Sequence, residues 1–214
     1  FSNENFKFGT SKKIKINNKK IWAQRLSYVG ELGFELYIEM EEAKEIYNLI
    51  VDKGKEFNLS NCGMLAMDTM RMESGYLHWG HDISPEENQY QAGLQFAISY
   101  KKNINFIGKD AVLKIRNKEP SKKLFMFTLD ESKPGHPLLL HDEPILCDGT
   151  IVGRTTSGNF SFNFKKNLAF GYINFKNSKD IVGKKFEIEV EKERHKATIE
   201  HHPLFDLKNS YLKS

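Results

Sequence analysis

The sequence predicts an α+β fold in which a region of mixed strands and helices is followed by a small β-barrel. Two observations carry this prediction. Up to about residue 120, segments with apolar residues at every second position alternate with helical stripes. Beyond that point the chain shows only short strand patterns separated by turn residues, which is typical of a small barrel or sandwich. A length of 214 residues suits roughly one to two domains.

Alternating apolar and polar residues predict three strands in the first region. The clearest is FELYI, in which Phe34, Leu36 and Ile38 alternate with Glu35 and Tyr37. The strand segments are residues 14–16, 34–38 and 94–100.

Three helices are expected between and after these strands. Apolar residues at i, i+3, i+4, i+7 and i+8 over residues 43–51 predict an amphipathic helix that ends at Gly54. A second helix is expected over residues 60–72, with a cap at residue 60 or 61 and a stop at Gly75. A third is expected over residues 110–116, capped by its first residue.

The second region begins near Pro120, within the polar stretch NKEPSKK of residues 117–123. We therefore expect two domains, residues 1–120 and residues 121–214. The predicted strands of the barrel are residues 124–129, 151–155, 168–173, 186–190 and 195–201.

Composition excludes several classes of protein. The 32 basic and 28 acidic side chains leave a net charge of +4 and are mixed along the chain, so no nucleic-acid partner is expected. No run approaches the roughly 18 apolar residues of a membrane helix, so no membrane partner is expected. Cys62 and Cys147 are too few for a disulfide framework and favour a reducing compartment. We expect a cytoplasmic protein; an organelle matrix stays open because the chain starts at Phe1 rather than Met.

Familiar catalytic fingerprints are absent from the sequence. It contains no GxGxxG, GxxxxGK[ST], GxSxG or HExxH, and we assign no catalytic residue. His78 and His81 lie three residues apart before Asp82, a spacing too common to predict a metal site by itself.

The stretch YVGELGFELY, residues 28–37, is more specific. Gly30 and Gly33 allow a tight turn between two strands, and Glu35 and Tyr37 project from the face opposite the apolar row. An ionised carboxylate accepts two hydrogen bonds side by side, so it suits a planar ligand with two adjacent N–H donors, such as a pterin or guanine edge. The alternative is an ordinary surface hairpin with Glu35 in water.

Ordered blocks of residues extend this observation over nearly the whole chain. Together they resemble the aminomethyltransferase (glycine cleavage T-protein) folate-binding superfamily, and within it most resemble the C-terminal part of sarcosine and dimethylglycine dehydrogenases. The blocks are YVGELGFELY at 28–37, MRMESG at 70–75, HWGHD at 78–82, AGL at 92–94, FIGKDA at 106–111, EPIL at 143–146, GTIVG at 149–153, TSG at 156–158 and PLFD at 203–206.

The resemblance implies a folate-binding α+β domain, incomplete at its N-terminus, followed by a C-terminal β-barrel. It also implies an additional α+β segment before Tyr28 and, in the dehydrogenases, an FAD domain further upstream. FAD is therefore expected only on a missing upstream domain, and this chain resembles the C-terminal piece of a longer polypeptide.

Two residues match the family's pterin pocket when they are carried over one at a time. Glu35 matches the glutamate that binds the pterin ring, and Tyr28 matches an aromatic residue that lines the same pocket. Glu31 is expected to brace the turn instead.

Two further residues are candidates for folate binding with open alternatives. Arg71 either neutralises a folate carboxylate or pairs with Asp68 or Glu73 on its own helix. Trp79 either stacks on the ligand or belongs to the core.

The resemblance implies the tetrahydrofolate-binding portion of an FAD-dependent demethylating dehydrogenase. Flavin would oxidise an N-methylated glycine to an iminium, and tetrahydrofolate would capture the one-carbon unit as 5,10-methylenetetrahydrofolate. We expect this portion alone to be inactive. One alternative is an aminomethyltransferase or folate-dependent demethylase without flavin; Met67, where T-proteins have a ligand-contacting arginine, argues against a true T-protein. Another is a folate-binding protein of iron–sulfur maintenance, whose KGCYxGQE-like motif is not found here.

Overall fold

The structure is a computed structural model that describes residues 1–102, 104–176, 178–206, 208 and 210–213. The chain divides into two compact units. Unit 1 comprises Phe1–Ser74 and Phe205–Ser214, and unit 2 comprises Gly75–Leu204.

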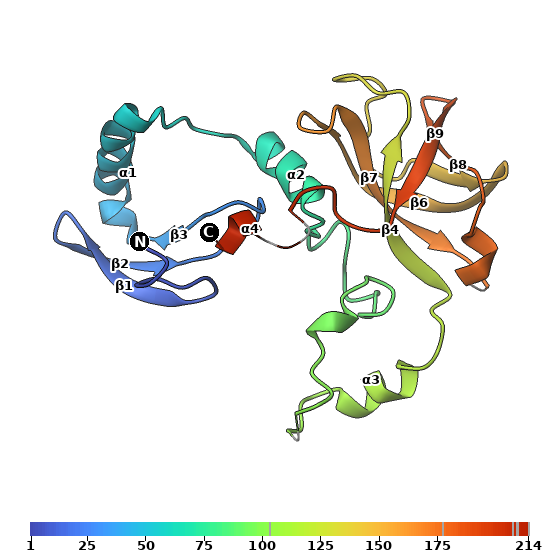
Figure 1. The fold of residues 1–214 in the computed structure, drawn as a ribbon, viewed down its shortest axis with the longest axis horizontal. Coiled ribbons are helices and arrows are strands. Elements are labelled where there is room, and N and C mark those ends of the chain that lie inside the picture. The colour runs from blue at the N-terminus through green and yellow to red at the C-terminus, as the bar shows by residue number, and fades with distance from the viewer. Residues whose placement is uncertain (103, 177, 207, 209, 214) are drawn as a thin grey trace. The chain divides into compact units, whose positions relative to one another are not determined.

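Unit 1 consists of a small antiparallel sheet and helices, and Figure 1 shows its chain from blue to green with the C-terminal segment in red. The sheet has the order β1-β2-β3. Its strands are β1 Ser11–Ile16, β2 Lys19–Gln24 and β3 Glu35–Tyr37. The helices are α1 Met40–Gly54, α2 Met64–Glu73 and α4 Ser210–Lys213, with a short 3₁₀ turn η1 at Lys55–Phe57.

The β1–β2 hairpin forms because two asparagines accept the backbone that its turn requires. Asn17 and Asn18 have φ of 46° and 66°, a left-handed conformation that asparagine tolerates better than most residues. The register that follows pairs Ile16 with Lys19 and buries Ile21 and Ala23 on one face of β2. Trp22 is thereby directed to the opposite, exposed face.

Arg25 fastens both ends of the chain to unit 1. Its side chain is buried, and its guanidinium donates hydrogen bonds to the carbonyl oxygens of Phe6, at 2.7 Å, and of Lys213, at 3.4 Å. The residue that follows β2 therefore ties the first and the last segments to the sheet.

Most predictions for unit 1 are confirmed, with two corrections. The helix that ends at Gly54 and the strands around residues 14–16 and 35–37 are present. The second helix begins at Met64 rather than at residue 60, and its N-cap is Gly63 rather than residue 60 or 61. No tight turn joins the strands before and after Gly30, since residues 25–34 form a ten-residue connection between β2 and β3.

Unit 2 is built around a closed six-stranded barrel with the order β4-β7-β6-β5-β8-β9, drawn from yellow-green to red in Figure 1. Every pairing is antiparallel. The buried side chains that fill it include Phe127, Leu129, Ile145, Ile173 and Ile188. The strands are β4 Lys122–Leu129, β5 Pro144–Cys147, β6 Thr150–Ser161, β7 Lys166–Asn174, β8 Phe186–Val190 and β9 Glu193–Glu200, with a short turn η3 at Ser178–Ile181.

The predicted barrel is confirmed, and β5 is the strand that the sequence did not reveal. Ile145 and Leu146 are adjacent and both buried, so the segment lacks the alternation that marks a strand. The register with β6 also shifts here: Ile145 is paired with Gly153 and Leu146 with Ile151, so Val152 of β6 is an additional, bulged residue.

The segment before the barrel contains few regular elements, namely η2 Gln95–Ala97 and α3 Lys109–Ile115. It is fastened to β4 by an ion pair of 2.8 Å between Glu87 and Lys122 and by a 2.8 Å hydrogen bond from the Leu124 amide to the Gln91 carbonyl. The cap of α3 is Gly108 rather than Asp110.

The predicted strand over residues 94–100 is wrong. Its central apolar side chain, Phe96, is 82% exposed, so the alternation there does not mark a buried face. The backbone closes local turns instead: the Leu94 amide donates to the Gln89 carbonyl and the Ala97 amide to the Leu94 carbonyl. A pattern of four apolar residues cannot specify a strand when local turns satisfy the backbone.

The expected boundary near Pro120 stays a prediction. Residues 116–121 lie between α3 and β4 without helix or strand, and most are exposed. Limited trypsin digestion should cut first between Lys118 and Lys123, because an exposed, irregular backbone enters a protease site most easily. Mass spectrometry of the earliest fragments checks this; first cuts beside Gly54 or at the termini would place the joint elsewhere.

Candidate functional site

The structure places three of the four predicted site residues in unit 1 and the fourth in unit 2. Tyr28 lies in the connection between β2 and β3, Glu35 on β3 and Arg71 on α2. Trp79 lies in the loop that opens unit 2.

Glu35 faces solvent, as the alternation predicts. It is exposed, whereas its neighbours Phe34 and Leu36 are half-buried. The Tyr37 hydroxyl donates a 2.8 Å hydrogen bond to the Glu35 carboxylate, and this bond raises the pKa of Tyr37. A carboxylate has about four lone-pair positions, so Glu35 keeps acceptor capacity for an N–H edge of a ligand while Tyr37 fixes its orientation.

The same face of the sheet carries aromatic rings that the sequence reasoning missed. Trp22 on β2 is paired with Tyr37 across the strands, and both rings are about half exposed, at 41% and 53%. Gln24 is paired with Glu35 in the same way. The sequence gives no clear signal for this, because Ile21, Trp22 and Ala23 are three consecutive apolar residues without apolar and polar alternation.

The loop that carries Tyr28 rests against the end of α2. Gly30 has φ of +82°, and a Cβ added there would lie 2.0 Å from the Ser74 hydroxyl oxygen. That hydroxyl donates to the Val29 carbonyl at 3.2 Å. Only glycine permits this approach, which seats the connection that carries the half-buried Tyr28 against Ser74, three residues after Arg71 in the chain.

Arg71 forms the intrahelical pair that was one of its two expected roles. Its side chain is 1% exposed, and Nε and Nη2 lie 2.8 Å and 2.7 Å from Oδ1 of Asp68. Because both residues lie on α2, this ion pair is internal to the helix. Contact with a folate carboxylate stays a prediction.

Trp79 is not a core residue, which removes one of its two interpretations. Its side chain is 65% exposed, whereas Asp82, three residues later in the same loop, is completely buried. The loop therefore exposes the Trp79 indole to solvent and buries the Asp82 carboxylate.

Histidine rings gather beside this loop. The ring centres of His78 and His81 are 4.5 Å apart, and those of His81 and His141 are 6.4 Å apart. Within the described residues, no three histidine, cysteine or acidic side chains come together in a way that can hold a metal ion.

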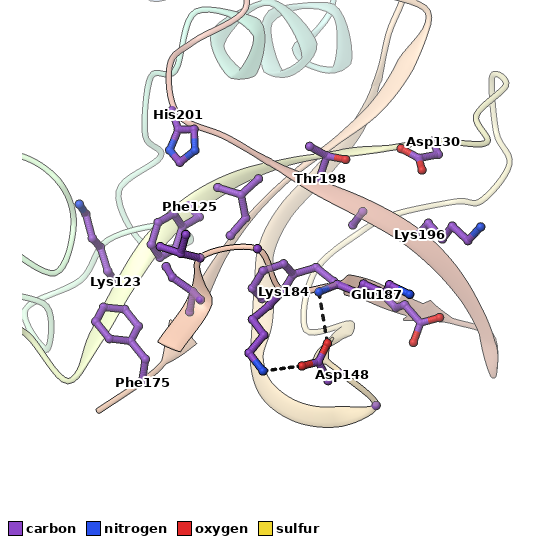
Figure 2. A pocket seen from close by; sticks show the side chains of 18 residues that line it. Lys123, Phe125, Asp130, Asp148, Phe175, Lys184, Glu187, Lys196, Thr198 and His201 are labelled. Carbon is purple, nitrogen blue, oxygen red and sulfur yellow. Dashed lines mark hydrogen bonds and ion pairs between the residues drawn. The ribbon is translucent and has the colours of Figure 1, made fainter. Parts of the chain in front are cut away.

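A hollow on unit 2 lies elsewhere and is lined mainly by residues of the barrel strands and their connections. It has a volume of about 890 Å³ and includes none of the four predicted residues. Figure 2 shows Phe125 and Phe175 at one end and the ion pair between Lys184 and Asp148 at the other. The hydrogen bond that Lys184 donates to the Asp148 carboxylate lowers the pKa of Asp148 below its usual value.

Two family models match consecutive parts of the chain. Residues 1–102 match the family described as the GCVT N-terminal domain, and residues 122–206 match the glycine cleavage T-protein C-terminal barrel domain. The chain belongs to the glycine cleavage T-protein family, and the predicted fold and resemblance are confirmed.

The relatives include enzymes of two kinds. The chain is 35% identical over 205 residues to mitochondrial dimethylglycine dehydrogenase of Homo sapiens, covering 95% of this chain and 23% of that protein. It is 34% identical over 182 residues to the aminomethyltransferase of Symbiobacterium thermophilum, covering 85% of this chain and 47% of that protein. The chain thus spans a quarter to a half of these relatives' lengths.

A solved structure supports the fold. The glycine cleavage system aminomethyltransferase T from Bartonella henselae superposes with a TM-score of 0.79 over 95% of this chain and 54% of its own, at 22% identity. Among the described residues, no helix has the length and apolar character needed to cross a bilayer.

The close approach of Gly30 to Ser74 predicts a stability difference between two glycines of unit 1. Gly9 also has a positive φ, +74°, but nothing lies within 4 Å of the Cβ that it lacks. Gly9→Ala should cost about 1 kcal/mol for the left-handed backbone alone, and Gly30→Ala about 2 to 4 kcal/mol because overlap adds to it. Urea unfolding followed by circular dichroism measures both; equal losses would show that the Tyr28 loop does not rest on α2.

Proposed function

We propose that this chain is the tetrahydrofolate-binding portion of an FAD-dependent demethylating dehydrogenase that acts on N-methylated glycines. The observation that carries the proposal is the exposed Glu35 carboxylate, held by the Tyr37 hydroxyl on the face of β3 opposite the apolar row. It occurs in a chain that is 35% identical over nearly its whole length to a dimethylglycine dehydrogenase.

The residues present suit a reduced folate. Glu35 offers acceptor oxygens to the N–H edge of the pterin, and the half-buried Tyr28 offers an aromatic ring for stacking. The exposed Trp79 offers a second stacking surface, and Arg71 a positive charge that Asp68 already shares. These four side chains are the proposed folate contacts.

In this proposal, FAD would be bound by another domain of the polypeptide. When bound there, it would supply the two-electron oxidation of the N-methyl amine. The residues of this chain would bind and orient tetrahydrofolate so that the one-carbon unit is captured as 5,10-methylenetetrahydrofolate. Holding the acceptor close raises its effective concentration and limits the loss of free formaldehyde.

A second candidate is an aminomethyltransferase or a folate-dependent demethylase that uses no flavin. The observation that favours it is the 34% identity to a bacterial aminomethyltransferase, of which this chain spans 47%. Met67 is half-buried on α2. By resemblance, T-proteins have a ligand-contacting arginine at this position, so Met67 argues against a true T-protein. The reading frame upstream of Phe1 distinguishes the two, because a GxGxxG fingerprint there indicates a flavin domain.

Glu35→Gln should weaken tetrahydrofolate binding by roughly 30- to 150-fold, which corresponds to about 2 to 3 kcal/mol. The amide keeps one acceptor oxygen but turns an NH₂ group toward the donor edge of the pterin. Isothermal titration calorimetry with tetrahydrofolate, on the native polypeptide that carries this chain, measures the change.

Glu31→Gln is the matched control, because Glu31 is an exposed glutamate four residues earlier, in the connection that leads to β3. Its affinity should stay close to that of the wild type. A larger loss at Glu31 than at Glu35 would show that the pterin anchor is the other carboxylate.

The 214-residue chain alone should show no oxidoreductase activity, since it contains no dinucleotide fingerprint. The measurement is dye reduction with added FAD and either sarcosine or dimethylglycine. Sustained turnover by the chain would overturn the assignment of oxidation to another domain.

A further inference from the structure

The loop that displays Trp79 is closed around the buried carboxylate of Asp82. One carboxylate oxygen of Asp82 accepts the His78 amide hydrogen at 2.8 Å, and the Asp82 amide donates to the His78 carbonyl, also at 2.8 Å. The Gly80 amide donates to the Ile83 carbonyl at 2.8 Å, and Gly80 has φ of +90°. The backbone of residues 78–83 is therefore folded back on itself, with Asp82 inside.

The other carboxylate oxygen of Asp82 is held by the barrel. It accepts hydrogen bonds from the hydroxyls of Thr156 and Ser157 on β6, the latter at 2.8 Å. The Tyr172 hydroxyl on β7 donates to the Asp82 carbonyl oxygen at 3.0 Å. An ionised carboxylate only accepts hydrogen bonds, so this set of donors matches its chemistry.

A bulge in β6 allows two consecutive side chains to reach one oxygen atom. Neighbouring side chains of a regular strand point to opposite faces of the sheet. Here Thr155 is paired with Gly171 and Ser157 with Phe170, so Thr156 is the additional residue of the bulge. Bulges commonly redirect a side chain in this way beside functional sites.

We propose that Asp82 is a positioning residue for the folate site: it anchors the loop of residues 78–83 to β6 and β7 and thereby fixes the exposed ring of Trp79. The inference rests on the proposed function, in which Trp79 stacks on tetrahydrofolate. A ring that is 65% exposed has few contacts of its own to hold it, so its orientation depends on the backbone that carries it.

Fluorine NMR of the full chain labelled with 5-fluorotryptophan tests the anchor without any ligand. The chain has two tryptophans, Trp22 on β2 and Trp79 in the loop, and Trp22→Phe assigns the two signals. In Asp82→Asn, the Trp79 signal should shift and sharpen as the ring gains mobility, while the Trp22 signal stays in place. An unchanged Trp79 signal in a folded Asp82→Asn chain would overturn the proposal.

A milder pair of variants decides the matter if Asp82→Asn does not fold. Thr156→Val removes one hydroxyl donor to Asp82, and Thr128→Val removes a similar hydroxyl in β4, which donates to Glu200 at 2.7 Å. Only Thr156→Val should move the Trp79 signal. Equal spectra for the two variants would contradict the proposed anchor.

A double-mutant cycle connects the anchor to folate. Asp82→Asn should weaken tetrahydrofolate binding roughly fivefold or more, the lower end of what one stacked ring contributes. In a Trp79→Ala background the same change should have little further effect, because Asp82 acts through Trp79. Additive losses would overturn this link. If the wild-type chain does not bind tetrahydrofolate, the proposed function fails, while the NMR spectra still decide whether Asp82 fixes the ring.

Discussion

The burial of the Asp82 carboxylate imposes the strictest constraint on unit 2. A charged group without water must find hydrogen-bond donors, and the free-energy cost of leaving it unpaired is several kcal/mol. Two of its donors come from one bulged strand of the barrel, and one comes from its own loop. The conformation of the loop of residues 78–83 therefore depends on the bulge of β6 at Thr156, which brings both hydroxyls to Asp82.

A second constraint of the same kind orders unit 1. Gly30 and Ser74 approach so closely that no side chain fits between them, and this contact seats the Tyr28 loop on the end of α2. The buried pair of Arg71 and Asp68 lies on the same helix. Tight backbone approaches and satisfied charges thus hold the segments that carry the proposed folate contacts, whereas Glu35 itself stays exposed on a three-residue strand. Rigid support beneath an accessible polar group is the arrangement that ligand binding requires.

The relatives divide between dehydrogenases and aminomethyltransferases, and this division has a physical basis. Both kinds of enzyme can share a module that holds a one-carbon acceptor, because the chemistry that generates the one-carbon unit can reside elsewhere. Function in such families is decided by the groups at the site and by the domains joined to it, not by the fold.

Local patterns in the sequence determined much of this protein: the amphipathic α1, the outward-facing Glu35 and the strands of the barrel other than β5 all follow from the spacing of apolar residues. The family could also be recognised, because its motifs are contiguous.

Tertiary structure alone decided three other features. The bulges at Val152 and Thr156 of β6 depend on the neighbouring strands, which no local pattern encodes. The apolar residues around Phe96 alternate as in a strand, but Phe96 is exposed and the backbone there forms hydrogen bonds within local turns. Three partners of Asp82 on the barrel, Thr156, Ser157 and Tyr172, lie more than seventy residues away in sequence, so only folding brings them to the buried acid.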